Sequence, residues 1–485
     1  MNKIKFKTLI PVFFLMFCYF IFPLNISAEE AEIKIQNTND AVLLNEVLYN
    51  IKKYHISNPD ISVLIDSAID GMLNFLNDPN TEYISPEKFN EYIYSLDNKY
   101  IGIGIEIKQE DAYPIITNVF ASSPAQSVGL KAGDFIIKVN NENVFNIPLE
   151  TVSKKIRGKE NTTVSLTIRR DNEEMNVLVI RKHLTIPTVD AKLIDDNIIY
   201  IKINSFNENT PSEFIESYRA VSKCDPKGII LDLRNNPGGY LTSAVEIADY
   251  FLPKGVKIID VAKNSDDKIT FYSENDPIIS DLKLAVLIDE NTASAAEILA
   301  GILKYYNLSS LVGEKTYGKG TVQTIINLSN GGGLKLTIAE YKLAGYVQIE
   351  GIGLTPDKRV VHPELQVFSA KNILNPSDKY EIFLNINQRI LTINDFDLKA
   401  PLITQEDGKS YIPVRFIAEI LGCDVEYCKK TSAVIVTKEK EREIIYLNNQ
   451  DSNYDFIFQS NTTYINVNEI ERIAKALNVK IDFKK

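Results

Sequence analysis

The chain of 485 residues is too long for one hydrophobic core, and a length of this order indicates about three domains. Apolar residues make up 45% and charged residues 24% of the chain, which is typical of globular domains and excludes a largely disordered protein. A net charge of −11 argues against nucleic-acid binding, because that function needs a basic surface.

The N-terminus has the pattern of an export signal. Lys3, Lys5 and Lys7 precede an apolar run over residues 9–24, and small residues then offer a cleavage site for signal peptidase. We therefore expect residues 1–28 to be a signal peptide, and the rest of the chain to be exported and secreted or associated with the cell envelope. An uncleaved membrane anchor is the alternative, although the run is shorter than the about 20 residues of a spanning helix.

Residues 29–96 have a helical pattern. Apolar side chains recur at helical spacing over residues 43–51 and again over 64–76. Ser85 and Pro86 then provide a cap and a first-turn proline for a third helix. Such helices pack on another domain or on a second copy of the chain, so a homodimer through them is one predicted partner.

Short strands replace the helices from residue 97 to 183, with one helix expected over 149–156. The glycine-rich segment Tyr100-Ile101-Gly102-Ile103-Gly104 opens this region, and Gly133-Asp134 follows further along. The pattern resembles that of PDZ domains. Strands are expected at 101–107, 114–116, 135–139, 164–168 and 177–180.

The PDZ resemblance implies a peptide-binding site. In such a site the backbone N–H groups of a glycine-rich loop hold the carboxylate of a peptide, and an open strand edge pairs with its main chain. The residues that this assigns to peptide binding are Ile101, Gly102, Ile103 and Gly104. The alternative is that these glycines only permit a tight turn.

Residues 184–375 alternate buried strands with helices. The runs 198–203, 228–233 and 284–288 are almost continuously apolar, as strands buried on both faces require. Helices are expected over 211–222, 241–251 and 294–305. Strand–turn–helix units of this kind predict a layered α/β core.

The last part of the chain, residues 376–485, contains a weak internal repeat. Tyr411-Ile412-Pro413-Val414 and Tyr464-Ile465-Asn466-Val467 each begin a strand, helix and second strand. This region resembles the copper-amine-oxidase N-terminal-like module, which in that family is an accessory module without redox chemistry. We predict a wall, envelope or self-association partner for it, with an inert packing unit as the alternative. Its two cysteines, Cys423 and Cys428, are expected either to pair or to stay as unpaired thiols.

Any hydrolytic site in this chain needs a base other than histidine. Only His55, His183 and His362 are present, and none of them lies beside a serine in a strand-to-helix turn. Lysine is the alternative base, and serine–lysine pairs are an established variant of the nucleophile–base arrangement. A lysine needs burial for this role, because its ordinary pKa of about 10.4 keeps the amine protonated.

Three segments contain candidate catalytic groups. Ser294 follows a buried strand and begins an alanine-rich helix, where N–H groups and the helix dipole favour an oxyanion, although it is also a plausible helix cap. Lys319 lies between two glycines, and Gln323 is placed to orient its amine. The third segment, residues 231–239, ends another buried strand in Gly238-Gly239.

Together these segments, behind a PDZ-like unit, resemble the C-terminal processing (tail-specific) peptidases, the S41 serine peptidase family, over residues 40–375. The resemblance implies that Ser294 is the nucleophile, Lys319 the general base and Gln323 the residue that orients the lysine. It also implies an oxyanion hole made by Gly238 or Gly239 with the Ala295 N–H. Two departures from the family pattern, Ala296 and the turn at 341–345, touch none of these groups.

The prediction is therefore an exported serine endopeptidase without metal or cofactor, in which the PDZ domain binds substrate C-termini and gates the cleft. A non-enzymatic PDZ adaptor with a degenerate peptidase core is the alternative. The fold class is multidomain α/β and α+β. The predicted parts are a signal peptide (1–28), an N-terminal helical segment (29–96), a PDZ domain (97–183), an S41 peptidase core (184–375) and an accessory module (376–485).

Overall fold

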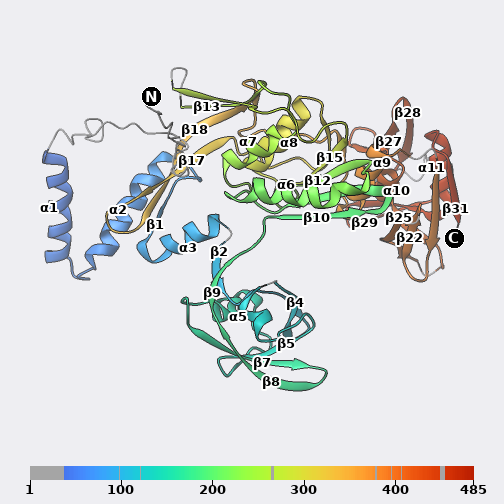
Figure 1. Cartoon of the computed structure of the whole chain (residues 1–485). Coiled ribbons are helices and arrows are strands. Elements are labelled where there is room, and N and C mark those ends of the chain that lie inside the picture. The colour runs from blue at the N-terminus through green and yellow to red at the C-terminus, as the bar shows by residue number, and fades with distance from the viewer. Residues whose placement is uncertain are drawn as a thin grey trace, which may run out of the picture. The chain divides into compact units, whose positions relative to one another are not determined.

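The computed structural model describes residues 38–484 except 98, 121, 264–266, 377–378, 395, 406 and 448–453. The predicted signal peptide lies outside these residues. The chain divides into two compact units, one formed by residues 1–89 and 322–338 and the other by 90–321 and 339–485 (Figure 1). Among the described residues, no helix has the length and apolar character that crossing a membrane requires.

The first unit contains the predicted N-terminal helices. They are α1 (Thr38–Tyr54), α2 (Ile61–Leu76) and the start of α3 (Pro86–Leu96), within which the unit boundary falls. No residue of α2 is buried, and the homodimer through these helices stays a prediction. The short strand β1 (Glu82–Ile84) was not predicted, because it forms by antiparallel pairing with the distant β18 (Gly333–Leu343).

The PDZ region folds around an antiparallel sheet in the order β3-β4-β5-β7-β8. The strand expected over 101–107 is interrupted at Gly104, which adopts φ +85° and whose added β-carbon would lie 2.2 Å from Ser123 Cβ. The predicted helix is confirmed as α5 (Leu149–Ile156). The remaining elements are β2 (Lys99–Gly102), β3 (Ile105–Glu110), β4 (Tyr113–Val119), α4 (Pro124–Ser127), β5 (Phe135–Val139), β6 (Glu142–Asn143), β7 (Thr163–Arg170), β8 (Glu173–Ile180) and β9 (Lys182–Thr185), which pairs with β2.

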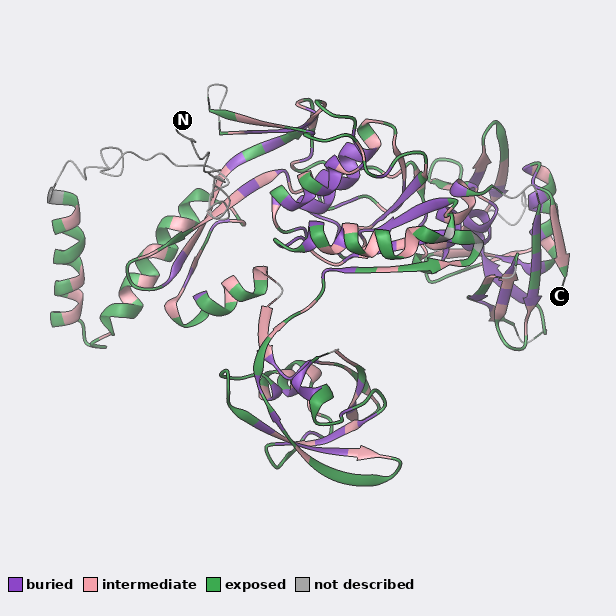
Figure 2. Cartoon of the chain, in the orientation of Figure 1, coloured by how far each residue is buried: buried purple, intermediate pink, exposed green. Residues whose placement is uncertain are grey.

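The peptidase core has a mainly parallel sheet in the order β10-β11-β12-β15-β16-β20. Strands β12 (Gly228–Asp232) and β15 (Lys283–Ile288) are adjacent, parallel and buried over almost their whole length (Figure 2). Their carboxyl ends, and the loops that follow them, therefore lie at one edge of the sheet. The other strands are β10 (Val189–Ile194), β11 (Ile198–Ile203), β16 (Ser309–Gly313) and β20 (Lys358–Arg359), and the helices are α6 (Thr210–Val221), α7 (Leu241–Asp249), α8 (Ala295–Tyr305) and α9 (Pro363–Leu374).

A second sheet is built around β18, which runs through both units. Its last residues pair antiparallel with β13 (Lys257–Ala262), which also pairs with β14 (Lys268–Tyr272). Strands β17 (Thr321–Asn327) and β19 (Val347–Gln348) also pair with β18.

The C-terminal module confirms the predicted internal repeat. One copy is β25 (Ser410–Pro413), α10 (Val414–Ile420) and β26 (Asp424–Cys428); the other is β30 (Thr462–Asn466), α11 (Ile470–Ala476) and β31 (Ile481–Lys484). The first strands of the two copies pair with each other. The remaining strands are β21 (Tyr380–Asn385), β22 (Ile390–Ile393), β23 (Phe396–Lys399), β24 (Ile403–Thr404), β27 (Ala433–Lys438), β28 (Glu441–Tyr446) and β29 (Phe456–Gln459).

The disulfide alternative for the module is wrong, because Cys423 and Cys428 are both free thiols. Cys423 directly precedes β26 and Cys428 is its last residue, and an extended segment of this length separates its ends by about 16 Å. A disulfide needs Cα atoms closer than about 7 Å.

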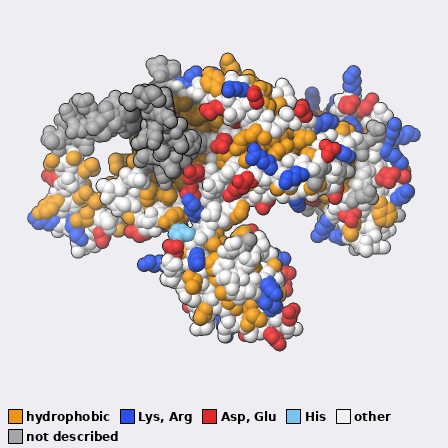
Figure 3. All heavy atoms as spheres, viewed as in Figure 1, with side chains coloured by type: hydrophobic (Ala, Val, Ile, Leu, Met, Phe, Trp, Pro, Cys, Tyr) orange, Lys and Arg blue, Asp and Glu red, His pale blue; other side chains and the backbone are white. Residues whose placement is uncertain are grey.

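Charges of both signs are interspersed on the face of the molecule that Figure 3 shows. Lysine and arginine side chains alternate there with aspartate and glutamate, and the visible described surface contains no continuous basic patch.

Candidate active site

Ser294 occupies a strained turn between β15 and α8. Its backbone has φ +54° and ψ −119°, a conformation that non-glycine residues rarely adopt and that often marks functional sites. The loop before it is anchored to the end of β12, since the Thr292 hydroxyl donates to Leu233 O at 2.9 Å and the Ala293 N–H donates to Asn236 O at 3.0 Å. These bonds hold the serine at the N-terminus of α8.

Glu297 joins the backbone of Ser294 to that of Lys319. Its Oε2 accepts hydrogen bonds from the Ser294 N–H and the Lys319 N–H, both at 2.9 Å, so the two nitrogens lie within twice that distance of each other. Its Oε1 accepts from the Gly318 N–H at 2.8 Å and from the Thr316 hydroxyl at 2.5 Å. Burial raises the pKa of this fully buried carboxyl above its usual value, and the four hydrogen bonds oppose that shift.

Tyr341 contacts the same two residues through their carbonyl groups. Its hydroxyl donates to Lys319 O at 2.6 Å and lies 3.3 Å from Ser294 O. The side chain is 2% exposed, and burial raises its pKa well above 10, so the hydroxyl stays a neutral donor. Glu297 thus holds the N–H groups of Ser294 and Lys319, and Tyr341 holds their C=O groups.

Lys319 is half-buried, and the glycines on both sides of it permit close backbone contacts. An added β-carbon on Gly318 would lie 2.9 Å from Gly353 N, and one on Gly320 would lie 2.4 Å from Glu350 N. The lysine loop is therefore packed against the segment around residues 350–353, and larger residues beside Lys319 would force it away.

Gln323 belongs to the first unit, whereas Ser294 and Lys319 belong to the second. Its Nε2 donates to the Thr337 hydroxyl at 3.2 Å, between β17 and β18. Its predicted role in orienting the lysine stays a prediction.

The glycine loop after β12 packs directly on the nucleophile segment. An added β-carbon on Gly238 would lie 2.8 Å from Ser294 Cβ and 2.9 Å from Ala295 N. The Gly238 N–H already donates to Asn236 Oδ1 at 2.8 Å. By contrast, the N–H groups of Gly239 and Ala295 meet no acceptor in the described part of the chain. Of the two glycines left open by the sequence, Gly239 is thus the better candidate for an oxyanion donor.

A buried ion pair supports this loop from the end of β12. Arg234 donates from Nε to Asp232 Oδ1 at 2.8 Å and from Nη2 to Oδ2 at 2.6 Å, and the Tyr200 hydroxyl also donates to Asp232. Burial alone would raise the pKa of Asp232, but the hydrogen bonds and charge of Arg234 lower it below its usual value. The arginine also donates to Gln366 Oε1 at 2.9 Å, which connects the loop to α9.

The sequence reasoning did not assign a role to Glu297, Tyr341 or Asp232. A signal existed for Glu297, because a serine followed three residues later by glutamate at a helix start is the capping-box pattern. No comparable local signal marks Tyr341, whose contacts depend on the placement of β18.

The three histidines contact other groups. His362 Nδ1 lies 2.8 Å from Glu419 Oε2, and the His183 ring packs edge-on against Tyr94 with centroids 5.0 Å apart. His55 Nδ1 contacts the Ser57 hydroxyl at 2.7 Å.

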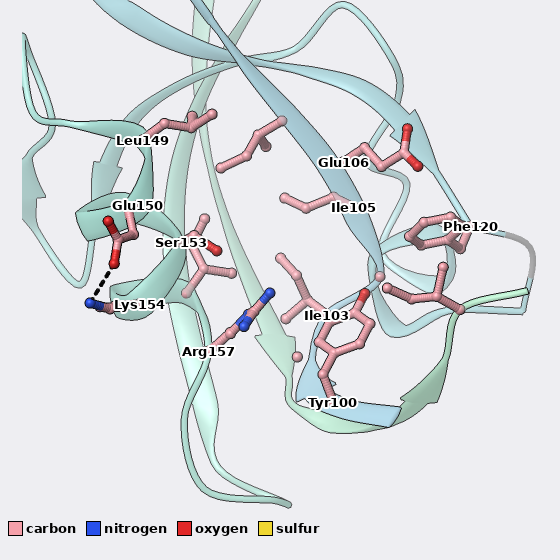
Figure 4. Close-up of a pocket in the computed structure, with 15 residues that line it drawn as sticks. Tyr100, Ile103, Ile105, Glu106, Phe120, Leu149, Glu150, Ser153, Lys154 and Arg157 are labelled. Atoms are coloured by element: carbon pink, nitrogen blue, oxygen red, sulfur yellow. Dashed lines mark ion pairs between the residues drawn. The ribbon is translucent and has the colours of Figure 1, made fainter. Parts of the chain in front are cut away.

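The PDZ domain contains a cavity of about 570 Å³ at the predicted peptide site. Gly102, Ile103 and Gly104 line it, whereas Ile101 is not among the lining residues. Its walls include apolar side chains of β3 and α5, and the Arg157 guanidinium lies 5.4 Å from the centre of the Tyr100 ring (Figure 4). The cavity thus combines an apolar pocket with the glycine-containing segment expected to hold a carboxylate.

Two regions of the chain match known protein families. The model of "Peptidase family S41" matches residues 197–360, and the "PDZ domain" model matches residues 95–169. The "Probable CtpA-like serine protease" of Staphylococcus aureus strain N315 is 34% identical over 335 residues, which cover 68% of this chain and 67% of that protein. The chain belongs to peptidase family S41.

This S41 peptidase is thus a serine-type member of the C-terminal processing proteases with a PDZ domain. Its C-terminal part matches the "Copper amine oxidase N-terminal domain" at residues 370–436 and 390–482. The solved photosystem II D1 C-terminal processing protease is 25% identical, covering 68% of this chain and 95% of that one, with a TM-score of 0.42. The PDZ domain of a carboxy-terminal protease from Vibrio cholerae, solved with a peptide, is 29% identical over 18% of this chain and 99% of that one, with a TM-score of 0.17.

Proposed function

We propose that this S41 peptidase is an exported endopeptidase that cleaves peptides, often near the C-terminus, by acyl transfer from Ser294 with Lys319 as base. The observation that carries the proposal is the single carboxylate oxygen of Glu297 that accepts from the N–H groups of both residues. A shared acceptor of this kind places the two residues beside each other although they come from different loops.

In the proposed mechanism the neutral Lys319 amine removes the proton from Ser294 Oγ, and the oxygen attacks the scissile carbonyl. The N–H groups of Gly239 and Ala295 stabilise the oxyanion, and a donor of this kind contributes about 10²–10³ in rate. Lys319 then gives its proton to the leaving amine, so the C–N bond breaks and an acyl-enzyme remains. Water hydrolyses the ester by the same route and restores the serine.

The base must be neutral at working pH. Lowering the pKa of lysine by about three units costs about 4 kcal/mol at 1.36 kcal/mol per unit. Desolvation of the amine is the means by which a protein lowers such a pKa, and Lys319 is half-buried. Gln323 is proposed to orient the amine toward Ser294.

The PDZ domain is proposed to bind the free C-terminus of a substrate and to control access to the cleft. Its apolar cavity suits an apolar terminal side chain, and its glycine segment suits the carboxylate. The substrate class is therefore unstructured protein tails with an apolar last residue.

The decisive test uses an unstructured peptide with an apolar C-terminal residue and compares the wild type with Ser294→Ala and Lys319→Ala. Removing a member of a nucleophile–base pair leaves a residual rate lower by about 10⁴ or more, so cleavage should fall below detection in both. Lys315→Ala is the matched control, because Lys315 is exposed on the same loop. Circular dichroism checks folding. Undiminished cleavage by folded Ser294→Ala protein would refute the proposal.

Export is proposed from the N-terminal pattern alone. A basic start, an apolar run and small residues before position 29 support cleavage after Ala28. N-terminal sequencing of the protein recovered from outside the cytoplasm should begin at Glu29, and recovery only of unprocessed chain from the cytoplasm would contradict it.

A further inference from the structure

The side chain of Gln323 contacts a threonine on the neighbouring strand. Strands β17 and β18 pair with each other, and Gln323 Nε2 donates to the hydroxyl of Thr337 in β18 at 3.2 Å. A glutamine amide has an oxygen that only accepts hydrogen bonds and a nitrogen that only donates them. Because Nε2 is directed at Thr337, the oxygen Oε1 is directed away from it. The Thr337 hydroxyl therefore determines which end of the amide faces the other way.

The orientation of a lysine amine depends on which end of the amide it meets. The amide oxygen accepts a hydrogen of the amine and leaves the nitrogen lone pair of a neutral amine available to take a proton. The NH₂ end would instead occupy that lone pair, which the proposed base Lys319 needs for the proton of Ser294. Lys319 lies four residues before Gln323 in the chain. The proposed role of Gln323 thus requires the amide orientation that the bond to Thr337 favours.

Thr337 is itself held by the turn between α2 and β1. The Thr337 N–H donates to the Thr81 hydroxyl at 3.1 Å, and that hydroxyl donates to Asp78 Oδ2 at 2.6 Å. Asp78 Oδ1 also accepts from the Asn80 N–H at 2.9 Å, which is the contact of an Asx turn. The Thr81 side chain belongs to a residue that is only 8% exposed, so its two hydrogen bonds are shielded from water.

Strand pairing keeps this turn in register with Thr337. Strand β1 directly follows the turn and pairs antiparallel with β18, with Glu82 opposite Lys335 (Figure 1). The Lys335 ammonium lies 2.9 Å from Glu82 Oε1, which adds an ion pair to the backbone pairing. The turn, β1 and residues 322–338 all belong to the first compact unit. The hydrogen bonds from Asp78 to Gln323 therefore lie within one unit.

We propose that Thr337 is a positioning residue that sets the orientation of the Gln323 amide, and that the Asp78–Thr81 turn holds Thr337 in register with it. The inference rests on the proposed peptidase function and deepens it. A line of hydrogen bonds runs from Asp78 through Thr81 and Thr337 to Gln323. The segment that follows the N-terminal helices thereby contributes to the orientation of the base, although it contains neither the base nor the nucleophile.

The first test compares Thr337→Val with Thr337→Ser by steady-state kinetics on an unstructured reporter peptide with an apolar C-terminal residue. Valine keeps the branched shape of threonine but lacks the hydroxyl, so the amide loses the partner that fixes its orientation. A neutral hydrogen bond contributes a factor of about 2 to 10. We expect kcat to fall by about 5-fold in Thr337→Val with KM unchanged, and Thr337→Ser to retain the kcat of the wild type.

A second comparison separates positioning from a purely structural role. If Thr337 acts through the amide, Thr337→Val should cause no further loss of kcat once Gln323 is alanine. A structural defect would lower kcat by the same factor in both backgrounds. Gln323→Glu provides another background, because both ends of a carboxylate accept hydrogen bonds, and Thr337→Val should then change kcat by less than about 2-fold. This background keeps the inference testable if Gln323→Ala is too slow to measure.

The turn is tested by Thr81→Val and Thr81→Ser. Thr81→Val removes the acceptor of the Thr337 N–H, so kcat should again fall, whereas Thr81→Ser should match the wild type. Thr324→Val is the matched control, because Thr324 adjoins Gln323 in β17 and its side chain lies on the opposite face of the strand. Circular dichroism checks the folding of each variant.

Three outcomes would each overturn the inference. They are wild-type kcat in folded Thr337→Val protein, an equal fractional loss of kcat in the Gln323 variants, and wild-type kcat in Gln323→Ala itself. Failure of the proposed function is a separate result, because it would appear as full activity of Ser294→Ala.

Discussion

The Tyr341 hydroxyl lies outside the serine–lysine pair but contacts the backbone of both residues. Its contribution to catalysis can be measured. The change Tyr341→Phe removes only the hydroxyl that donates to Lys319 O at 2.6 Å. A hydrogen bond of this kind contributes about 1 kcal/mol, and its loss leaves a buried carbonyl without that donor. We expect kcat to fall about 10-fold, since 1.36 kcal/mol corresponds to a factor of ten, with KM unchanged.

Steady-state kinetics on the reporter peptide would check this expectation, with Tyr346→Phe as the control. Tyr346 is 79% exposed and follows Tyr341 closely in the chain, so its hydroxyl should contribute nothing to kcat. A Tyr341→Phe enzyme with wild-type kcat would show that the backbone of Lys319 needs no support from this hydroxyl.

The residues of the site differ in how far the sequence could predict them. Ser294 and Lys319 could be found because each has local signals, a strand-to-helix boundary in one case and flanking glycines in the other. Glu297 has a capping-box signal, but that pattern predicts only a bond to Ser294. Its bonds to Gly318 and Lys319 depend on the approach of two distant loops, which no local pattern specifies.

At the scale of elements, the parallel strands could be predicted better than the short antiparallel ones. Strands β12 and β15 are buried on both faces, so their apolar runs are nearly continuous and their ends are clear. Strand β1 has three residues and exists through its pairing with residues 333–335, so periodicity cannot reveal it. The site forms in the loops that follow β12 and β15. Because the ends of these two strands could be predicted, the positions of the loops in the sequence could be predicted as well, but not the contacts that the loops make.

The packing of the glycine loop against α8 leads to a prediction for Gly238→Ala. The residue has φ +97°, and an added β-carbon would lie 2.7 Å from Ala293 O and 2.8 Å from Ser294 Cβ. Because these are backbone and nucleophile atoms, the loop must move as a whole. We expect kcat to fall by about 10² or more, with unchanged peptide binding by the PDZ domain, measured by kinetics and fluorescence anisotropy.

Gly255→Ala is a control that distinguishes the effect of this collision on kcat from the effect of backbone strain. Gly255 has a similar φ of +83°, but an added β-carbon there would meet nothing within 4 Å. The left-handed conformation costs an alanine about 1–2 kcal/mol at either position, so both variants should unfold at a somewhat lower temperature than the wild type. Equal kcat in the two variants would mean that the effect of alanine at residue 238 comes from backbone strain alone and not from a collision with Ser294.

At the scale of the whole molecule, the C-terminal module shares a hydrophobic core with the peptidase domain. Buried side chains of α9, including Leu365 and Phe368, belong to one cluster with Ile230 and Leu287 of the parallel sheet. The same cluster continues into the module through Phe416 and its neighbours. The sequence predicted the repeat in this module but not its attachment, because the apolar faces that meet are far apart in the chain. A wall or envelope partner for the module remains a prediction.

This shared core predicts that peptidase domain and module unfold together, with Glu419 as a main contact between them. Its carboxylate, on a side chain that is 1% exposed, accepts from the Val361 N–H at 2.9 Å and contacts His362 Nδ1 at 2.8 Å. Glu419→Ala leaves these partly buried groups without their acceptor, and the loss of a buried hydrogen-bond partner costs about 1–3 kcal/mol. We expect one calorimetric transition in the wild type and a lower midpoint in the variant, with unchanged kcat below that temperature because Glu419 contacts neither Ser294 nor Lys319. Glu426→Ala, at an exposed position of β26, should match the wild type. Two well-separated transitions in the wild type would show instead that the module is an independent domain.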